Sequence, residues 1–417
     1  MQAPPAAPGP AADSFRRLWD ELSAIGRSPG GGYERYSWTE AELACRAWFR
    51  EQADRRGLEV TEDGNGNLTA WWGSPLAGDY VLTGSHFDSV PGGGAFDGPL
   101  GIVSGFLAVD LLREQGHEPK RRSIGIAAFV EEEGARFGVP CLGTRLATGA
   151  IAPETARALT DREGTTLAAA MEAAGADPAK LGPDLRGGER PFDGLAHFVE
   201  LHIEQGRALD DQDAPVGVAT GIWPHGRWRM RFRGAGDHAG TALLADRRDP
   251  MLTFAFAALA ARKEARLAGA RATVGRVEAH PNATNAVPDR VDAWLDVRAA
   301  DAEAVGLVLE GLQTKVRERA GRDGTGFEIE LESFSDAVEF DPGLRERLRG
   351  LLGGVPAVPT AAGHDAGILN GHAAEGTAML FVRNPTGVSH APAEHASDED
   401  CAAGAGALAA VLRELAP

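Results

Sequence analysis

Apolar residues recur along the first part of the chain at two spacings, and their alternation predicts an α/β architecture. Strand-like runs occupy 58–62, 68–72, 80–84 and 123–130. Ser37 and Glu40 have the spacing of a capping box, which predicts a helix that ends near Gly57. A further helical pattern covers 99–115. Strands that alternate with helices indicate a largely parallel sheet.

Between residues 219 and 332 the order of the elements changes. The pattern predicts strands at 228–233, 271–278, 290–298 and 326–332 and helices at 249–265 and 301–320. This β-α-β-β-α-β order is that of a ferredoxin-like unit. Its first strand alternates Trp228, Met230 and Phe232 with arginines, so one face is expected to be buried and the other solvated or paired.

After residue 333 the chain returns to strand and helix signals and ends in an alanine-rich helix at 398–415. We therefore predict one discontinuous α/β domain, formed by 1–218 and 333–417, with 219–332 inserted as a second domain. A length of 417 residues suits two hydrophobic cores.

Charge and cysteine content exclude several classes of protein. A formal net charge of −18 argues against binding to nucleic acids and anionic membranes, and no apolar stretch is long enough to span a bilayer. Cys45, Cys141 and Cys401 form no CxxC pair, which fits a reducing compartment and no disulfide framework. Residues 1–13 lack the features of a signal peptide, so we expect a frayed tail on a cytoplasmic protein.

The first segment with candidate chemistry follows the run at 80–84. His86 and Asp88 come directly after this strand, and Asp97 lies in a glycine-rich loop before a helix. Open α/β sheets bind ligands at the carboxyl ends of their strands. Asp97 could bridge two cations, and Asp88 is placed to accept the second N–H of the His86 ring.

Three further segments follow apolar runs in the same way. Glu131, Glu132 and Glu133 form an acidic triple after 123–130, and His202 and His390 end two other runs. Alone, each histidine is more often structural, and the acidic triple is as consistent with a solvated turn as with a site. Together the segments supply the nitrogen and oxygen ligands expected of a pair of zinc or manganese ions.

These segments resemble the M20 metallopeptidase-like amidohydrolases, in particular the subgroup of N-carbamoyl-L-amino acid hydrolases, allantoate amidohydrolases and β-ureidopropionases. The resemblance runs from about residue 35 to the end. It is carried, in family order, by GGAFDG, EEGARF, ELHIEQG, HAGT, PNATNAVP and GVSHAPAEH. It implies a metal-binding α/β domain and an inserted ferredoxin-like lid through which the family forms homodimers.

The resemblance also implies roles for individual residues. His86 and His202 match the ligands of one divalent metal ion, Glu133 and His390 match those of a second ion, and Asp97 matches the bridging ligand. Two ions per subunit are expected, either Zn²⁺ or Mn²⁺, with Co²⁺ or Ni²⁺ also suited to such ligands.

Glu132 matches the family's general base, which acts beside a hydroxide that bridges the two ions. Glu131 receives no role.

In the lid, His238 matches a residue that donates to the developing oxyanion. Asn285 and Arg298 match the pair that binds the substrate carboxylate, and Gln205 and Gly363 match further substrate positions. Arg298 is expected to point away from the lid core, where a surface salt bridge is the alternative interpretation.

Two positions depart from the family pattern. Gly226 stands where allantoate amidohydrolases carry an arginine, and its neighbour Arg227 should point to the other face of the strand. Ala242 and Leu243 replace the usual threonine-proline pair after HAGT.

The leading hypothesis is hydrolysis of the carbamoyl C–N bond of an N-carbamoyl-L-amino acid to the amino acid, carbon dioxide and ammonia. Allantoate is the alternative small ureido carboxylate. A dipeptidase or aminoacylase is a further alternative, although those enzymes usually place a carboxylate where this chain has His202. A metal-free binding protein with the same fold would contain no stoichiometric metal.

Overall fold

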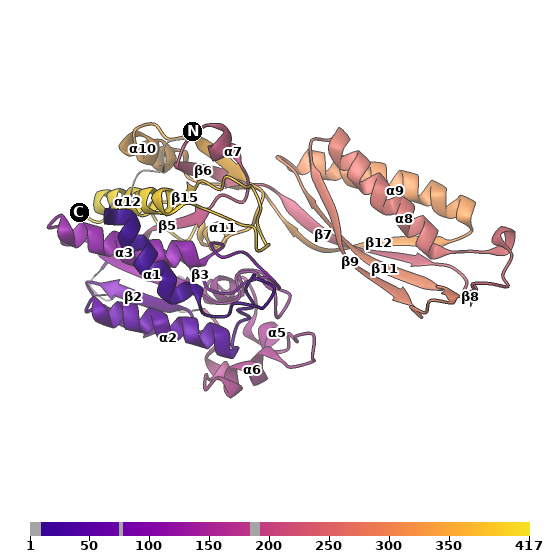
Figure 1. The fold of residues 1–417 in the computed structure, drawn as a ribbon, viewed down its shortest axis with the longest axis horizontal. Coiled ribbons are helices and arrows are strands. Elements are labelled where there is room, and N and C mark those ends of the chain that lie inside the picture. The colour runs from indigo at the N-terminus through magenta and orange to yellow at the C-terminus, as the bar shows by residue number, and fades with distance from the viewer. Residues whose placement is uncertain (1–9, 75–77, 184–191) are drawn as a thin grey trace, which may run out of the picture. The chain divides into compact units, whose positions relative to one another are not determined.

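The structure is a computed structural model that describes residues 10–74, 78–183 and 192–417. The chain forms two compact units, one made of Met1–Thr220 with Glu339–Pro417 and the other of Gly221–Val338 (Figure 1). No helix in the described ranges is long and apolar enough to cross a membrane.

The first unit is built on a mixed sheet. In the described residues it has the strand order β1-β2-β4-β3-β5-β15-β6-β13, with β14 paired to β6. The strands are β1 (Glu59–Glu62), β2 (Leu68–Trp72), β3 (Tyr80–His86), β4 (Ser123–Phe129), β5 (Leu195–Ile203), β6 (Val216–Ile222), β13 (Val338–Glu339), β14 (Ala357–Thr360) and β15 (Thr377–Val382). The neighbours β4, β3, β5 and β15 are parallel, whereas β1, β2 and β6 pair antiparallel. The predicted largely parallel sheet is therefore parallel only at its centre.

Helices cover both faces of these central strands, which explains their continuous apolar runs. Every residue of β3, β4, β5 and β15 is buried, as expected for strands covered on both sides. One core joins the sheet to α1 (Pro10–Ser23), α2 (Glu40–Arg55), α3 (Pro99–Glu114) and α12 (Asp398–Leu415). A smaller cluster packs around α4 (Leu142–Ala147), α5 (Pro153–Arg157) and α6 (Leu167–Ala173). The remaining helices of this unit are α7 (Ala208–Asp211), α10 (Pro342–Leu351) and α11 (Asp365–Leu369).

Two local predictions near the N-terminus were wrong. Residues 10–13 of the expected tail form the first turn of α1, where Ala12 is buried, and residues 1–9 lie outside the described ranges. Helix α2 starts after Thr39 rather than Ser37, without a side-chain cap. The carboxylate of Glu42 instead accepts the backbone N–H of Trp38 at 3.0 Å, which replaces the predicted capping box.

The second unit is a four-stranded antiparallel sheet with two long helices. Its long elements are β7 (His225–Arg233), α8 (Pro250–Leu267), β9 (Arg271–His280), β11 (Arg290–Arg298), α9 (Ala302–Asp323) and β12 (Gly326–Ser335). The strand order is β12-β7-β11-β9, and both helices share a core with one face of the sheet. A short ribbon pairs β8 (Asp237–His238) with β10 (Ala286–Val287).

The arginines on the other face of this sheet are paired. Arg229, Arg231 and Arg290 place guanidinium nitrogens 3.2, 2.9 and 3.0 Å from the carboxylate of Asp292, which is 1 % exposed. Burial alone would raise the pKa of Asp292, but these guanidinium groups hold it below its usual value. The basic face of β7 is therefore an internal charge network.

Two glycine substitutions separate packing from helix propensity. A β-carbon on Gly101 in α3 would lie 2.4 Å from the carbonyl oxygen of Leu201, whereas a β-carbon on Gly406 in α12 would meet nothing within 4 Å. We expect Gly101→Ala to lower the free energy of unfolding by about 1–3 kcal/mol through overpacking. The matched Gly406→Ala should raise it by up to about 1 kcal/mol. Urea denaturation measures both, and equal effects at the two positions would contradict the packing.

Candidate metal centre

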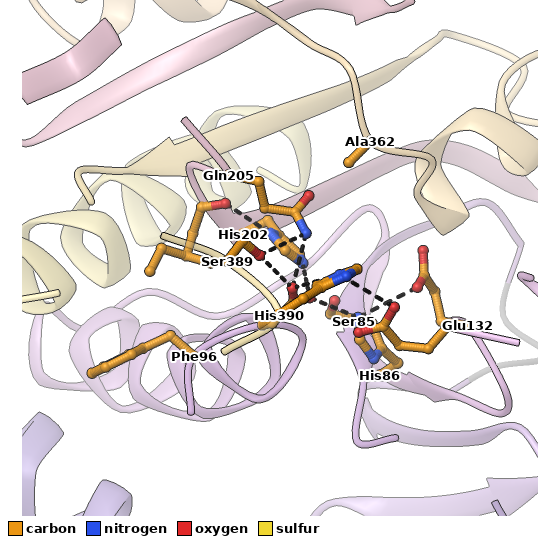
Figure 2. A network of polar contacts seen from close by, with 12 residues as sticks. Ser85, His86, Phe96, Glu132, His202, Gln205, Ala362, Ser389 and His390 are labelled. Carbon is orange, nitrogen blue, oxygen red and sulfur yellow. Dashed lines mark hydrogen bonds and ion pairs between the residues drawn. The ribbon is translucent and has the colours of Figure 1, made fainter. Parts of the chain in front are cut away.

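The candidate ligands meet because four parallel strands end at one edge of the sheet. His86 is the last residue of β3, Glu133 follows β4, His202 lies near the end of β5, and His390 lies in the loop after β15. Asp97 reaches the same place from the loop between β3 and α3. Segments up to 304 positions apart in the chain, from 86 to 390, thus supply one cluster (Figure 2).

The carboxylate of Asp97 lies between two groups of ligands. Its Oδ1 atom is 3.2 Å from Nε2 of His202 and 3.6 Å from Nε2 of His86. Its Oδ2 atom is 3.3 Å from Nε2 of His390, which is 3.4 Å from Oε2 of Glu133. Within each group the ligand atoms lie within 4.8 Å of one another, so one carboxylate can serve two cations.

The tautomers of His86 and His202 fit a bound cation. Nδ1 of His86 lies 3.0 Å from the carbonyl oxygen of Asp88, and Nδ1 of His202 lies 2.8 Å from that of Ile203. A carbonyl oxygen only accepts, so Nδ1 carries the hydrogen in both rings. Both Nε2 atoms are buried without a hydrogen-bond partner in the described residues. Two lone pairs directed at a carboxylate are repelled unless protons or a metal ion lie between them, and imidazole nitrogen with carboxylate oxygen suits Zn²⁺ or Mn²⁺.

Asp88 contacts the cluster through both its backbone carbonyl and its carboxylate. Its backbone carbonyl, not its carboxylate, accepts the hydrogen of the His86 ring. The carboxylate instead accepts the backbone N–H groups of Glu132 and Glu133 at 3.1 and 3.0 Å. The sequence prediction made Asp88 the acceptor of this ring hydrogen without naming the atom, and the acceptor is the backbone carbonyl. Asp88 therefore connects the segments after β3 and β4.

The electrostatics of the cluster are dominated by buried negative charge. Burial, then the neighbouring Asp97, raises the pKa of Glu133 to about 7. Burial alone would lower the pKa of His390, but Asp97 and Glu133 raise it to about 9. Burial alone would raise the pKa of Asp97, yet the three histidines hold it well below its usual range. Without other cations, the cluster must hold protons to compensate its charge.

Glu132 lies beside the ligands without belonging to either group. Its Oε2 atom is 3.7 Å from Nε2 of His86 (Figure 2), and the residue is 6 % exposed. Burial raises the pKa of this carboxyl group well above its usual value. Its neighbour Glu131 accepts the backbone N–H groups of Arg136 and Phe137 and so closes the turn that follows.

Several residues around Asp97 were assigned to other roles or missed by sequence reasoning. Gln205, predicted to contact substrate, donates its amide to Oδ2 of Asp97 at 2.8 Å. Ser389 donates its hydroxyl to the same oxygen at 3.0 Å, and Oε1 of Glu394 accepts the backbone N–H of Asp97 at 3.0 Å. Ser389 and Glu394 were not predicted, although both lie within the quoted GVSHAPAEH segment.

A third group of potential ligands, formed by Glu200, His202 and His364, lies next to the first. Both oxygens of Glu200 already accept hydrogen bonds, from the hydroxyl of Ser85 and the backbone N–H of Ala366, each at 2.9 Å. The ring of His364 packs against that of His202, with centroids 4.5 Å apart. Gly363, a predicted substrate position, directly precedes His364. This third group therefore packs against His202, through the ring of His364.

The remaining predicted residues lie in the second unit. His238 is exposed on β8, and its Nδ1 atom accepts the backbone N–H groups of Gly240 and Thr241 at 3.0 and 3.1 Å. Asn285 is adjacent, because its carbonyl accepts the N–H of Ala239 at 3.0 Å. Arg298 ends β11 on the face opposite the core, where its Nε atom donates to Asp296 at 2.8 Å.

Gly226 and Arg227, where the chain departs from the family pattern, lie on opposite faces of β7. Gly226 is buried opposite Val297, and a β-carbon there would lie 2.4 Å from the ring of Trp228. Arg227 faces the other side, where its Nε atom is 3.7 Å from Oδ2 of Asp296. A larger side chain at position 226 would therefore need Trp228 to move.

Comparison with known proteins places the chain in a family. The model of peptidase family M20/M25/M40 matches residues 82–414. N-carbamoyl-L-amino acid amidohydrolase from Geobacillus stearothermophilus is 37% identical over 96% of this chain and 98% of its own length. Allantoate amidohydrolase from Escherichia coli is 31% identical over 96% and 98%.

Solved structures agree with the family match. The crystal structure of an amidase of the hydantoinase/carbamoylase family from Burkholderia vietnamiensis superimposes with a TM-score of 0.85 at 29% identity, covering 96% of this chain and 97% of the other. Family, relatives and mixed α/β fold thus agree over nearly the whole length. The chain belongs to peptidase family M20/M25/M40, and within that family it is a hydrolase of the amidohydrolase type.

Proposed function

We propose that this protein hydrolyses the carbamoyl C–N bond of an N-carbamoyl-L-amino acid and releases the amino acid, carbon dioxide and ammonia. The observation that carries the proposal is the pair of ligand groups that share Asp97, with Glu132 beside them. His202 occupies a position where dipeptidases of this type usually have a carboxylate. The 37% identical relative named for this activity supports the same substrate class.

The ligand groups fit two divalent cations, with His86, His202 and Asp97 around one and Asp97, Glu133 and His390 around the other. When bound, such ions polarise a carbonyl group and lower the pKa of water. We propose Zn²⁺ or Mn²⁺, and Co²⁺ or Ni²⁺ suit the same donors.

Glu132 is the proposed general base. Its carboxylate takes a proton from the attacking water and passes it to the leaving nitrogen. Burial raises the pKa of Glu132 above its usual value, so this carboxylate binds a proton more readily than an exposed glutamate does. Its contact with His86 places it at the edge of the ligand cluster.

The second unit, Gly221–Val338, is proposed to act as a ferredoxin-like lid inserted between the two parts of the catalytic domain. Its strand order and two packed helices support this assignment. Nδ1 of His238 accepts two backbone N–H groups, so a neutral ring carries its hydrogen on Nε2. This atom is the proposed donor to the oxyanion.

Arg298 and Asn285 are proposed to bind the substrate carboxylate, with Gln205 and Gly363 as further contacts. Arg298 is held by Asp296, which orients the guanidinium group for a second carboxylate. The lack of a side chain at Gly226 favours N-carbamoyl amino acids over allantoate, since allantoate amidohydrolases carry an arginine there.

We also propose that the lid mediates homodimerisation. Leu252 and Leu259 lie seven residues apart on α8 with exposed fractions of 56% and 69%, and β9 is an edge strand of the sheet. An exposed apolar helix face beside an open strand edge is typical of a surface that another subunit covers. The three buried free cysteines support the cytoplasm as the proposed compartment.

Metal analysis tests the ligand groups. After reconstitution we expect about two ions per chain, and fewer in His86→Ala and Glu133→Ala, because each variant removes a ligand from one group. His372→Ala serves as the matched control because His372 belongs to neither group. Plasma mass spectrometry gives the stoichiometry, and a wild-type protein without stoichiometric metal would favour a binding role.

Ammonia release tests the reaction. The panel comprises N-carbamoyl-L-amino acids, N-carbamoyl-β-alanine and allantoate, together with N-acetyl amino acids, whose hydrolysis releases acetate rather than ammonia and is therefore followed by the free amino acid formed. We expect turnover of N-carbamoyl-L-amino acids, and a kcat about 10²–10⁴-fold lower in Glu132→Ala, because proton transfer is lost. Turnover of only the N-acetyl compounds would contradict the ureido assignment, and preference for allantoate would correct the substrate.

Mixing two inactive variants tests the dimer and the role of His238. If His238 acts on the site of the neighbouring subunit, a heterodimer of Glu132→Ala and His238→Ala contains one intact site. Equal amounts after subunit exchange should recover about one quarter of the wild-type activity, since half of the dimers are heterodimers. Each variant exchanged with itself is the control, and an absence of recovery in verified heterodimers would exclude the arrangement.

A further inference from the structure

The carboxylate of Glu132 accepts a hydrogen bond from one side chain in the described part of the chain, the thiol of Cys141. The Sγ atom lies 3.6 Å from Oε1, within the range of hydrogen bonds that involve sulfur. The other oxygen, Oε2, faces Nε2 of His86. The two oxygens of Glu132 therefore have different partners, the thiol on one side and the ligand cluster on the other.

Cys141 is held against Glu132 by the backbone as well. Its N–H donates to the carbonyl of Glu132 at 2.7 Å, and the next two N–H groups donate to the carbonyls of Glu131 and Val130 at 3.0 and 2.9 Å. The start of α4 is thus paired residue by residue with the segment that carries the general base. This pairing fixes the backbone of Cys141 beside Glu132.

The conformation of Cys141 is unusual for a residue with a side chain. Its φ angle is +53°, in the left-handed region where glycine is favoured and other residues are strained. Cys141 is 4 % exposed, and burial raises the pKa of its thiol well above the usual value, so the thiol remains a neutral donor. A strained, buried donor directed at the proposed base suggests a role for the side chain itself.

We propose that Cys141 is a positioning residue, whose S–H group orients the Glu132 carboxylate so that Oε2 faces the site of proton transfer. This inference rests on the proposed role of Glu132 as general base. Among the described residues the Cys141 thiol bonds to Glu132 and to none of the proposed metal ligands, so its loss is expected to affect the chemical step and to leave substrate binding unchanged. In kinetic terms, kcat falls while KM is retained.

The kinetic test compares Cys141→Ala with Cys141→Ser. We expect kcat of Cys141→Ala to fall about tenfold with KM within about twofold, which corresponds to the loss of one hydrogen bond. The serine variant restores a donor and should lie closer to the wild type. Cys401→Ala is the matched control, because it removes another buried thiol far along the chain. Equal kcat values for the alanine and serine variants would overturn the proposal.

An infrared measurement tests the hydrogen bond without any substrate. In a Cys45→Ala/Cys401→Ala background the S–H stretching band comes from Cys141 alone. We expect this band to move to higher frequency when Glu132→Ala removes the acceptor, with metal content and thermal stability recorded for each variant. An unchanged band would overturn the contact even if the enzyme is active. Conversely, inactivity on all ureido substrates with a shifted band would refute the proposed reaction and leave the hydrogen bond established.

Discussion

The structure around the site depends on one constraint, which is that the buried carboxylate of Asp97, shared by two groups of ligands, must have its charge compensated. Its two oxygens face different histidines, and a buried carboxylate costs several kcal/mol unless positive charge compensates it. Gln205, Ser389 and the backbone N–H held by Glu394 orient Asp97 from the outside. Charge compensation favours a cation beside Asp97, and these hydrogen bonds fix the position of the carboxylate that would hold it.

The scaffold supplies this geometry through strand direction and through strained backbone. Parallel β4, β3, β5 and β15 bring their carboxyl ends together, so distant segments meet without long loops. Glu131, Cys141 and His390 all have positive φ angles, of 55°, 53° and 56°. Such conformations persist only where neighbouring contacts enforce them, and here they turn the chain towards the ligands.

Much of this arrangement could be predicted from the sequence because hydrophobic period and strand-end chemistry are local signals. Helix α12 and strand β11 have their predicted bounds, 398–415 and 290–298. The atom through which Asp88 acts could not be predicted, since its carbonyl and carboxylate lie within reach of the same ring. The contacts of Gln205 and Glu394 with Asp97 could not be predicted, because each joins residues more than a hundred positions apart in the chain. The first unit resumes at Glu339 rather than at the predicted residue 333, because β12 continues to Ser335 and the short strand β13 follows it.

The position of β15 has a consequence for the order in which a newly made chain acquires its site. This strand lies between β5 and β6 in the sheet, although it follows β6 by more than 150 residues along the chain. Until it emerges from the ribosome, the exposed edge of β5 carries His202 without its parallel neighbour, and the segment with His390 is absent. Residues 221–338 form a separate compact unit, which can fold during this interval because domains generally fold as units. The candidate metal centre is therefore among the last parts of the molecule to be completed during synthesis.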